Sequence, residues 1–415
     1  MTVAAPALRP RFVLAGNPSV LWAMLLLGLV TLMATVLSEG MGIGLISTSF
    51  VKTLGKTLCL CLAAIAMDVV WGYLGILSLG HMAFFAIGGY AVGQWIMTAR
   101  TTAIVEASLA GQPLPPTPRE VEEAVAGQIF GVVGADEFPW IWAFSDSLGL
   151  QLLMVVLVPG LLALVFGWLA FRSRVAGVYL SILTQAMTLA LALWLFQNDS
   201  GLRGNNGLSG LQNVPVLESW GQDRLSVGFL WASALAFAAG YLLFAWLTSG
   251  RRGSLIRAVR DDEARLRFLG HGVEGVKLLV FTLTAVVCAV AGALYYPQAG
   301  IVNPGELAPL ASISLAVWVA IGGRGRLYGA ALGAAAVSLL SSWLTGGGAP
   351  DIPLGFGTFR WTDWWTVVLG LGFVAVTLLA PQGLGGLFDR LPRLRPRQGD
   401  WGPDDGAWRK EEGEP

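Results

Sequence analysis

The stretch LLMVVLVPGLLALVFGWLAF, residues 152–171, decides the fold class, because it runs for 20 residues without a charged side chain. A helix of about 20 apolar residues spans a hydrocarbon core of about 30 Å. This stretch belongs to an apolar run over residues 150–171. Nine comparable runs lie near residues 19–37, 50–70, 81–99, 177–196, 226–248, 277–296, 307–322, 327–345 and 362–380. The sequence therefore predicts an all-α membrane protein, a polytopic bundle of about ten transmembrane helices.

Composition supports the same conclusion. The 415 residues are 55% hydrophobic and 13% charged, whereas soluble domains carry about 25% charged residues. Glycine-rich residues 72–80, between the second and third runs, predict a short unwound or re-entrant segment. Backbone at membrane depth tolerates such a break only where protein or a water-filled path shields it.

The distribution of Lys and Arg predicts the orientation, since cytoplasmic loops carry an excess of these residues. With ten spans and a cytoplasmic N-terminus, the cytoplasmic segments hold 19 Lys and Arg and the outer segments between spans hold 5. Both termini are therefore expected in the cytoplasm. The expected parts are a cytoplasmic N-terminus (1–18), a transmembrane domain (19–388) with an outer loop (100–149) and a cytoplasmic segment (249–275), and a disordered cytoplasmic tail (389–415).

Several function classes are excluded. Lys and Arg number 26 and Asp and Glu number 26, so a net charge of zero gives no general case for nucleic-acid binding. Cys59, Cys61 and Cys288 form neither a disulfide framework nor a zinc pattern. His81 and His271 have no carboxylate at a useful spacing, and no nucleophile–base set is present. We expect no enzyme, no metal and no cofactor bound by this chain.

The charged segment 249–275 predicts one or two short amphipathic helices on the cytoplasmic side. Ser254 is a plausible N-cap, and Gly270 and Gly272 are typical of a helix end. An apolar side is formed by Leu255, Val259, Leu266 and Leu269. Such a segment is a solvated linker, a helix adsorbed to anionic lipid, or a helix that docks into a groove of a partner.

Three ordered blocks resemble permeases of the branched-chain amino acid and urea family of ABC transporters. They are RAVRDDEAR at 257–265, GYLGILSLGHMAFFAIGGY at 72–90, and the block from VNPG at 302 to VWVAIGGRGRLYG at 317–329. The resemblance covers about residues 50–390. It implies a bacterial inner-membrane permease subunit with a second homologous permease, two cytoplasmic ATP-binding subunits that use ATP, and an extracytoplasmic solute-binding protein. It also implies ATPase coupling by Arg257, Arg260, Asp261, Glu263, Arg265, Leu269 and Gly270.

Within the family, the chain looks closest to the urea permease. Asp68 stands where branched-chain amino acid permeases usually show asparagine, and the run Gly204–Gly207 (GNNG) is absent from them. The family often places glutamate where Ser314 lies, so a role for that carboxylate does not carry over. A branched-chain amino acid permease is the alternative, and a self-sufficient secondary transporter or channel is the alternative from another class. A membrane receptor or scaffold is a third possibility.

Urea offers hydrogen-bond donors and an acceptor without charge, so its path needs neutral polar groups. The candidates inside spans are Ser78, His81, Ser181, Thr184, Gln185, Thr188, Ser312 and Ser314. Asp68 joins them because an ionisable group at membrane depth is costly. In the alternative interpretation, these hydroxyls bond to their own backbone and Gln185 ties two helices together. Gly325, Gly329 and Gly333 predict close helix packing, either within the chain or with a sister permease.

Overall fold

The computed structural model describes residues 18–39, 43–110, 117–133, 140–173, 175, 177–215, 221–346, 352–354, 357–379 and 383–389. Every apolar run expected to span the membrane lies on a helix. In chain order these helices are α1 (Pro18–Leu37), α2 (Thr48–Asp68), α3 (His81–Leu109), α5 (Leu148–Arg172), α6 (Val178–Phe196), α7 (Gly221–Leu247), α10 (Val273–Ala299), α11 (Pro309–Gly322), α12 (Leu327–Thr345) and α13 (Trp361–Leu379). Among the residues that the structure describes, seven helices are long and apolar enough to cross a membrane. The polytopic helical fold is confirmed, with ten as an approximate number of spans.

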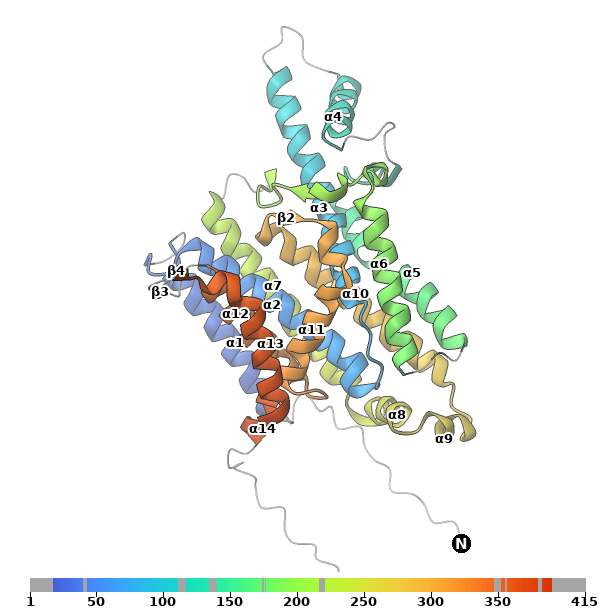
Figure 1. Ribbon diagram of the computed structural model, residues 1–415. Helices are drawn as coiled ribbons and strands as arrows, with labels where there is room; N and C mark the ends of the chain where they lie inside the picture. Colours follow the sequence, from blue (N-terminus) through green and yellow to red (C-terminus); the bar gives the residue numbers. More distant parts are fainter. Residues whose placement is uncertain are drawn as a thin grey trace, which may run out of the picture.

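The helices lie roughly side by side as an upright bundle (Figure 1). Helices α2 and α3 form its centre, since 78% of the residues in the most apolar 18-residue stretch of each are buried. In α5 only 22% of the corresponding residues are buried, so this helix turns most of its apolar surface outward. Helix α10 packs against α2, α3 and α5. A Cβ on Gly292 would collide with the carbonyl group of Phe85, and one on Gly88 would collide with that of Ala289. Glycine therefore allows α3 and α10 to approach closely, as small residues do in lipid.

The glycine repeat near α12 packs within the chain. Gly329 and Gly333 lie against the backbone of Gly322 and Trp318 in α11, with no room for a Cβ. Gly325 precedes α12, has φ +78°, and lies beside Gly72. Of the two expectations for this repeat, the structure shows the internal contact.

The expected break between the second and third spans is present. Helix α2 ends in a π-helical turn, Val69–Tyr73. Residues 74–80 are not helical, and α3 then begins at His81. We call residues 72–80 the break; it lies at the lower end of the bundle near α8 (Figure 1).

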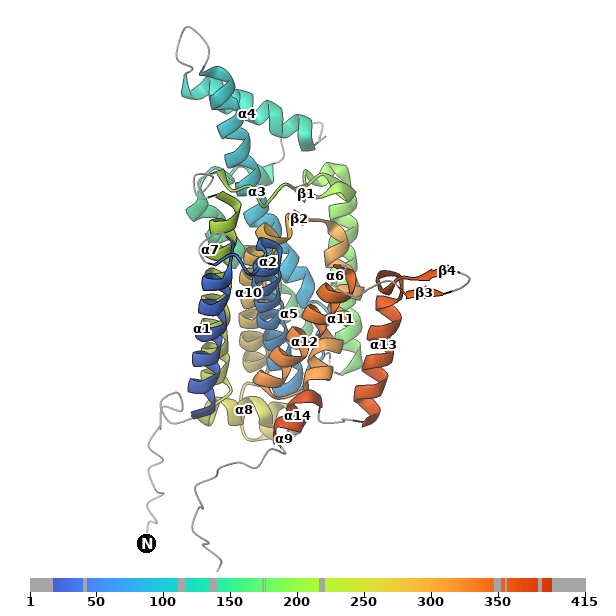
Figure 2. The same cartoon turned by 90° about the vertical axis from the view of Figure 1, so that its left-hand side faces the viewer.

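Two short helices form one end of the bundle, α8 (Gly250–Asp261) and α9 (Glu263–Phe268). Helix α14 (Gly383–Asp389) and the beginning of α1 lie at this same end (Figure 2). The expected N-cap at Ser254 is wrong. The helix begins at Gly250, five residues earlier than predicted, after Ser249 in extended conformation, and the Ser254 hydroxyl donates to the Gly250 carbonyl (3.0 Å).

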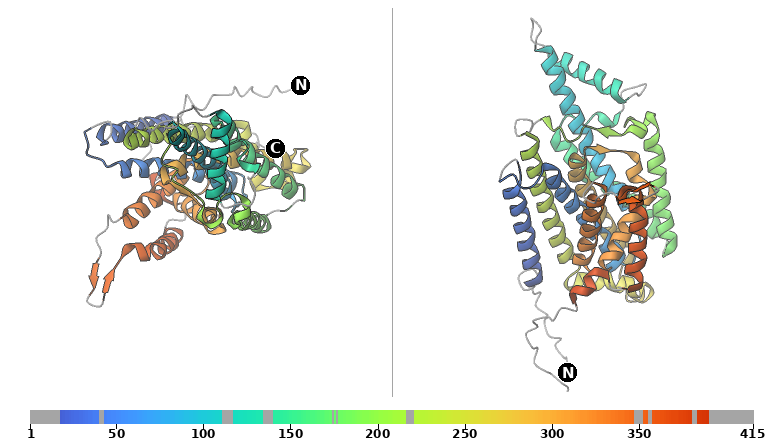
Figure 3. Two further views of the ribbon diagram at one scale, coloured as in Figure 1. Left: turned by 90° about the horizontal axis from the view of Figure 1, so that it is seen from above. Right: turned by 60° about the vertical axis from the view of Figure 1, so that its left-hand side comes forward.

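The opposite end carries an overhang. Helix α3 continues to Leu109 and forms a hairpin with α4 (Pro118–Val133) above the bundle (Figure 2). Most of the described part of the expected outer loop 100–149 is therefore helical. Below the hairpin, β1 (Leu208–Ser209) pairs antiparallel with β2 (Ile301–Val302). A second hairpin, β3 (Ile352–Leu354) with β4 (Gly357–Phe359), projects sideways (Figure 3). The expected N-terminal segment and cytoplasmic tail lie almost entirely outside the described residues.

Candidate transport path and coupling site

The break is held by hydroxyl groups of α6. The Ser181 hydroxyl donates to the Leu77 carbonyl (2.7 Å), and the Leu79 amide donates to the Thr184 hydroxyl (3.0 Å). Both bonds satisfy backbone groups that an unwound segment leaves without a helical partner. A buried backbone group without a partner is costly. Ser181 and Thr184 therefore have a structural task at this position.

His81, the first residue of α3, is fully buried and bonded through both ring nitrogens. Nδ1 lies 3.0 Å from the Ser78 hydroxyl and Nε2 lies 3.2 Å from the Thr284 hydroxyl of α10. The Met82 amide donates to the Ser312 hydroxyl of α11 (3.2 Å). Since neither ring nitrogen is open, His81 is not a metal ligand here. No group of three or more His, Cys, Asp or Glu suited to a metal occurs in the part of the chain that the structure describes.

Asp68 joins the end of α2 to the connection between α11 and α12. Its Oδ1 accepts from the Gly325 amide at 2.7 Å, and the side chain is fully buried. A Cβ on Gly72 would collide with both the Asp68 carboxylate and the Gly325 backbone. Arg324 lies on this connection between α11 and α12, and its guanidinium is 5.2 Å from the centre of the Trp71 ring in the π-helical turn after α2. Asp68 therefore joins two segments that are far apart in the sequence, the end of α2 and the connection between α11 and α12.

The other candidate path residues stay apart from the break. Thr188 is buried one turn along α6 from Thr184, and its hydroxyl donates to the Gln185 carbonyl (2.8 Å). The Ser314 hydroxyl donates to the Leu310 carbonyl of its own helix (2.9 Å). Such bonds to the preceding turn are the ordinary state of helical Ser and Thr. The structure thus brings Ser78, His81, Thr184 and Ser312 around the break, and leaves Gln185, Thr188 and Ser314 outside it.

Arg260 links α8 directly to the break. Its Nη1 donates to the Gly72 carbonyl at 2.8 Å, and its aliphatic stem fills the space that a Cβ on Gly75 would need. Gly75 has φ +82°, a conformation in which other residues are strained. The same guanidinium pairs with Asp261 (3.0 Å). The Arg260 side chain therefore connects α8, the helix that carries it, to the break.

The remaining charges of this segment mostly bind within the chain. Glu263 accepts from Lys277 of α10 and from Arg267, each at 2.6 Å. Arg257 donates to the Thr248 carbonyl (3.2 Å) at the end of α7. Asp262 caps α9 by accepting from the Arg265 amide. Glu263 thus fastens α9 to the beginning of α10.

Two apolar side chains at the end of α9 face outward. Phe268 is 92% exposed and Leu269 is 66% exposed. Gly270 follows with φ +85°, which ends the helix. The sequence analysis expected Leu269 on the same apolar side as Leu266, but only Leu266 is buried, because the chain leaves the helix at Leu269. Phe268 was missed, although a bulky apolar residue among charges was the available signal.

A second group that the sequence analysis missed lies toward the α4 end. Glu306 belongs to a 3₁₀ turn, Pro304–Leu307, between β2 and α11. Burial raises the pKa of its carboxyl group. The available signal was a lone acidic residue in the short connection between two apolar runs.

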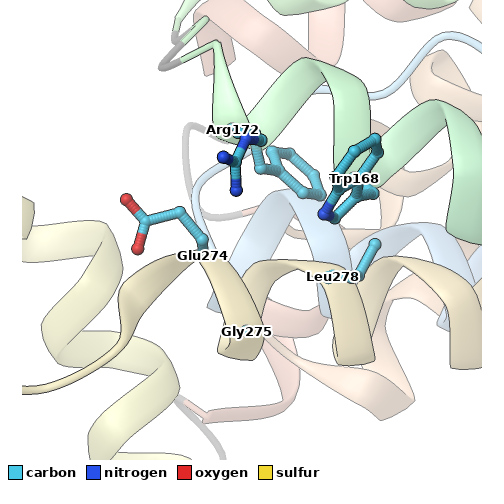
Figure 4. Close-up of a pocket in the computed structure, with 6 residues that line it drawn as sticks. Trp168, Arg172, Glu274, Gly275 and Leu278 are labelled. Carbon is cyan, nitrogen blue, oxygen red and sulfur yellow. The ribbon is translucent and has the colours of Figure 1, made fainter.

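A groove of about 550 Å³ separates α5 from the beginning of α10. Figure 4 shows Trp168 and Arg172 on α5 facing Glu274, Gly275 and Leu278 on α10. The Arg172 guanidinium lies 5.6 Å from the centre of the Trp168 ring. The groove shares no lining residue with the break, so it forms a separate feature at the α8–α9 end.

Comparison with known proteins identifies the family. The sequence profile described as "Branched-chain amino acid transport system / permease component" matches residues 49–377, most of the chain and all of the break and coupling contacts. The chain belongs to this family. Its members are ABC permease subunits, membrane components without catalytic activity of their own. ATP-binding and substrate-binding partners are general for such permeases.

Three relatives of this permease family are all from Escherichia coli. The probable ABC transporter permease YphD is 30% identical, covering 37% of this chain and 48% of the relative. The high-affinity branched-chain amino acid permease LivM is 26% identical over 64% of each. The ribose import permease RbsC is 25% identical over 48% of this chain and 64% of the relative. The chain thus spans from about half to just under two thirds of these relatives. No solved structure gives a significant match.

Proposed function

We propose that this chain is the permease subunit of an ABC importer for branched-chain amino acids. The observation that carries the proposal is the family match over residues 49–377. Among the relatives named above, LivM covers the largest share of this chain, 64% against 37% for YphD and 48% for RbsC. These comparisons support the branched-chain alternative of the sequence analysis rather than the urea permease.

The proposed assembly has four further subunits: a second homologous permease, two cytoplasmic ATP-binding subunits and an extracytoplasmic solute-binding protein. The α8–α9 end then faces the cytoplasm of a bacterial cell, in agreement with the distribution of Lys and Arg. Both termini are cytoplasmic in this orientation, and ATP is used by the partner subunits.

The ATP-binding subunit is proposed to receive the end of α9. Phe268 and Leu269 are exposed side by side at the end of a helix whose other side is fastened by Glu263. Exposed bulky apolar groups at a polar surface are typical of interaction sites, and a short helix with apolar anchors fits a groove in a partner. Arg265, which is exposed on the same helix, supplies a charge at the edge of this contact.

We propose that a movement of α8 changes the conformation of the break, and that the Arg260 side chain transmits this change. Its hydrogen bond to the Gly72 carbonyl connects α8 with the break. Residues 77–82 are in turn bonded to α6, α10 and α11. ATP can shift the conformation only through different affinities for two states of such an element. The break suits this role, because its residues 74–80 lie outside any helix.

The proposal is tested by uptake into membrane vesicles that contain the complete assembly. Labelled L-leucine and labelled urea are compared with and without ATP, and with a Phe268→Ser/Leu269→Ser variant of this chain. We expect ATP-dependent accumulation of leucine, little accumulation of urea, and loss of leucine uptake in the variant while the chain remains in the membrane. Accumulation of urea without leucine would overturn the substrate, and uptake without ATP would overturn the transporter class.

A further inference from the structure

We propose that the groove between α5 and α10 binds an anionic phospholipid, with the lipid phosphate on the Arg172 guanidinium and an acyl chain against Trp168 and Leu278. The groove has a volume of about 550 Å³, and its lining residues come from the end of α5 and the beginning of α10 (Figure 4). This inference is independent of the transported solute and assigns a ligand to a surface that the proposed function does not use.

The first observation is the depth of the groove in the membrane. Residues 152–171 of α5 carry no charge, and Arg172 is the last residue of that helix. A stretch of about 20 apolar residues crosses a hydrocarbon core of about 30 Å, so Arg172 lies where the core meets the headgroups. Trp168, one turn earlier, is 49% exposed, and tryptophan is enriched at this level of a membrane. The groove therefore lies at the depth of lipid phosphates.

The second observation is a cation without an acidic partner. Arg172 is exposed and forms no ion pair within the part of the chain that the structure describes. Its guanidinium lies 5.6 Å from the centre of the Trp168 ring. Glu274, the acidic residue of the groove, pairs instead with Arg267 at 2.9 Å. The Arg172 charge is therefore available to a ligand. Arginine binds phosphate through two parallel hydrogen bonds, and basic pockets between transmembrane helices bind anionic headgroups.

The third observation is the shape of the groove. A Cβ on Gly167 would meet the side chains of Leu278 and Phe281 at 3.0 Å and 3.2 Å, so α5 and α10 pack closely at this level. About one turn nearer to α9, a Cβ on Gly275 would meet nothing within 4 Å. The two helices therefore close the groove toward the middle of the membrane and leave it open toward the headgroups.

An apolar stripe on α5 leads into the groove. Leu161 and Val165 are exposed, and they precede Trp168 and Arg172 at spacings of three and four residues, which places all four on one face of the helix. The face is apolar within the span, aromatic near its end and cationic at the end. A phospholipid has the matching order of acyl chain, glycerol and phosphate. A free phosphate ion would use only the last of these groups.

The test measures lipid labelling of the complete transporter in phosphatidylcholine nanodiscs that contain a small fraction of photoreactive lipid. The photoreactive lipid is phosphatidylglycerol in one series and phosphatidylcholine in the other, and mass spectrometry locates the labelled residues. The variants are Arg172→Gln, Arg172→Lys, Gly275→Leu and Gly275→Ala. Arg252→Gln is the matched control, because Arg252 is also exposed and lies over a tryptophan, 3.5 Å from the centre of the Trp246 ring, but does not line the groove.

We expect phosphatidylglycerol to label the last turn of α5 and the first turns of α10 more strongly than phosphatidylcholine does. Arg172→Gln should lower this labelling about fivefold, the effect of one arginine at an anionic lipid surface, and Arg172→Lys should keep most of it. Gly275→Leu places a side chain in the groove without changing its charge and should remove most of the labelling, whereas Gly275→Ala should retain it. Arg252→Gln should match the wild type.

Equal labelling of the groove by the two lipids would overturn the inference, as would equal labelling in Arg172→Gln and Arg252→Gln. Absence of label from the groove would also overturn it, by showing that a partner subunit covers this surface in the complete transporter. Displacement of the lipid by soluble glycerol phosphate would overturn it in favour of a free-anion site. If Arg172→Gln does not reach the membrane, the comparison of Gly275→Leu with Gly275→Ala decides. None of these outcomes depends on leucine uptake.

Discussion

Replacement of Arg260 by alanine tests how α8 controls the break. The Arg260 guanidinium donates to the Gly72 carbonyl at 2.8 Å, and its side chain is 40% exposed. A hydrogen bond from a charged donor contributes about 1.5–3 kcal/mol. Exposure weakens such interactions, so we assign about 1–1.4 kcal/mol. Since 1.4 kcal/mol is about tenfold in an equilibrium, the variant should shift the balance between two states of the break about five- to tenfold.

The assay measures ATP hydrolysed per leucine taken up in proteoliposomes containing the complete assembly. If the Arg260 bond exists in only one of the two states, Arg260→Ala should raise this ratio about five- to tenfold. Arg119→Ala is the matched control, because Arg119 lies on α4 at the far end and forms an exposed pair with Glu123. An unchanged ratio in Arg260→Ala, with the control also unchanged, would refute transmission through this side chain.

Two further predictions concern the contact that fastens α9 to α10 and the packing of α10 against α3. Glu263→Gln leaves Lys277, which is 6% exposed, without its carboxylate partner, so the free energy of unfolding should fall by about 2 kcal/mol; an unchanged thermal midpoint in nanodiscs would contradict this. Gly292→Ala drives a methyl group into the α3 backbone and should abolish folded protein in the membrane, whereas Gly127→Ala, which faces open space, should be tolerated.

The sequence was sufficient for the features that depend on local composition. Long runs such as residues 152–171 predict spans because the cost of charge in hydrocarbon acts on each residue separately. The glycines of residues 72–80 predict the break for a similarly local reason. The beginning of α8 was misplaced, because Ser254 has N-cap chemistry but Gly250, with φ +58°, lets the chain turn into the helix earlier.

The hydrogen-bond partners of the polar side chains inside the spans could not be predicted, because the two members of each bonded pair lie far apart in the sequence. Thr184 bonds the Leu79 amide 105 residues away, and Asp68 bonds the Gly325 amide 257 residues away. The sequence shows that such groups exist at membrane depth. It does not show whether they face a solute or complete the bonds of an interrupted helix.

This distinction changes the argument about the solute. The sequence analysis favoured urea partly because neutral hydroxyls line the spans, but the structure uses Ser181 and Thr184 to satisfy the backbone of the break. Groups already bonded within the protein give no preference for a neutral solute. The buried hydroxyls of Tyr90 and Tyr296, which have no hydrogen-bond partner among the described residues, lie on α3 and α10 rather than on the break. Because a group already bonded within the protein has little left to offer a solute, the proposed substrate rests on the similarity to LivM and not on the polarity of the spans.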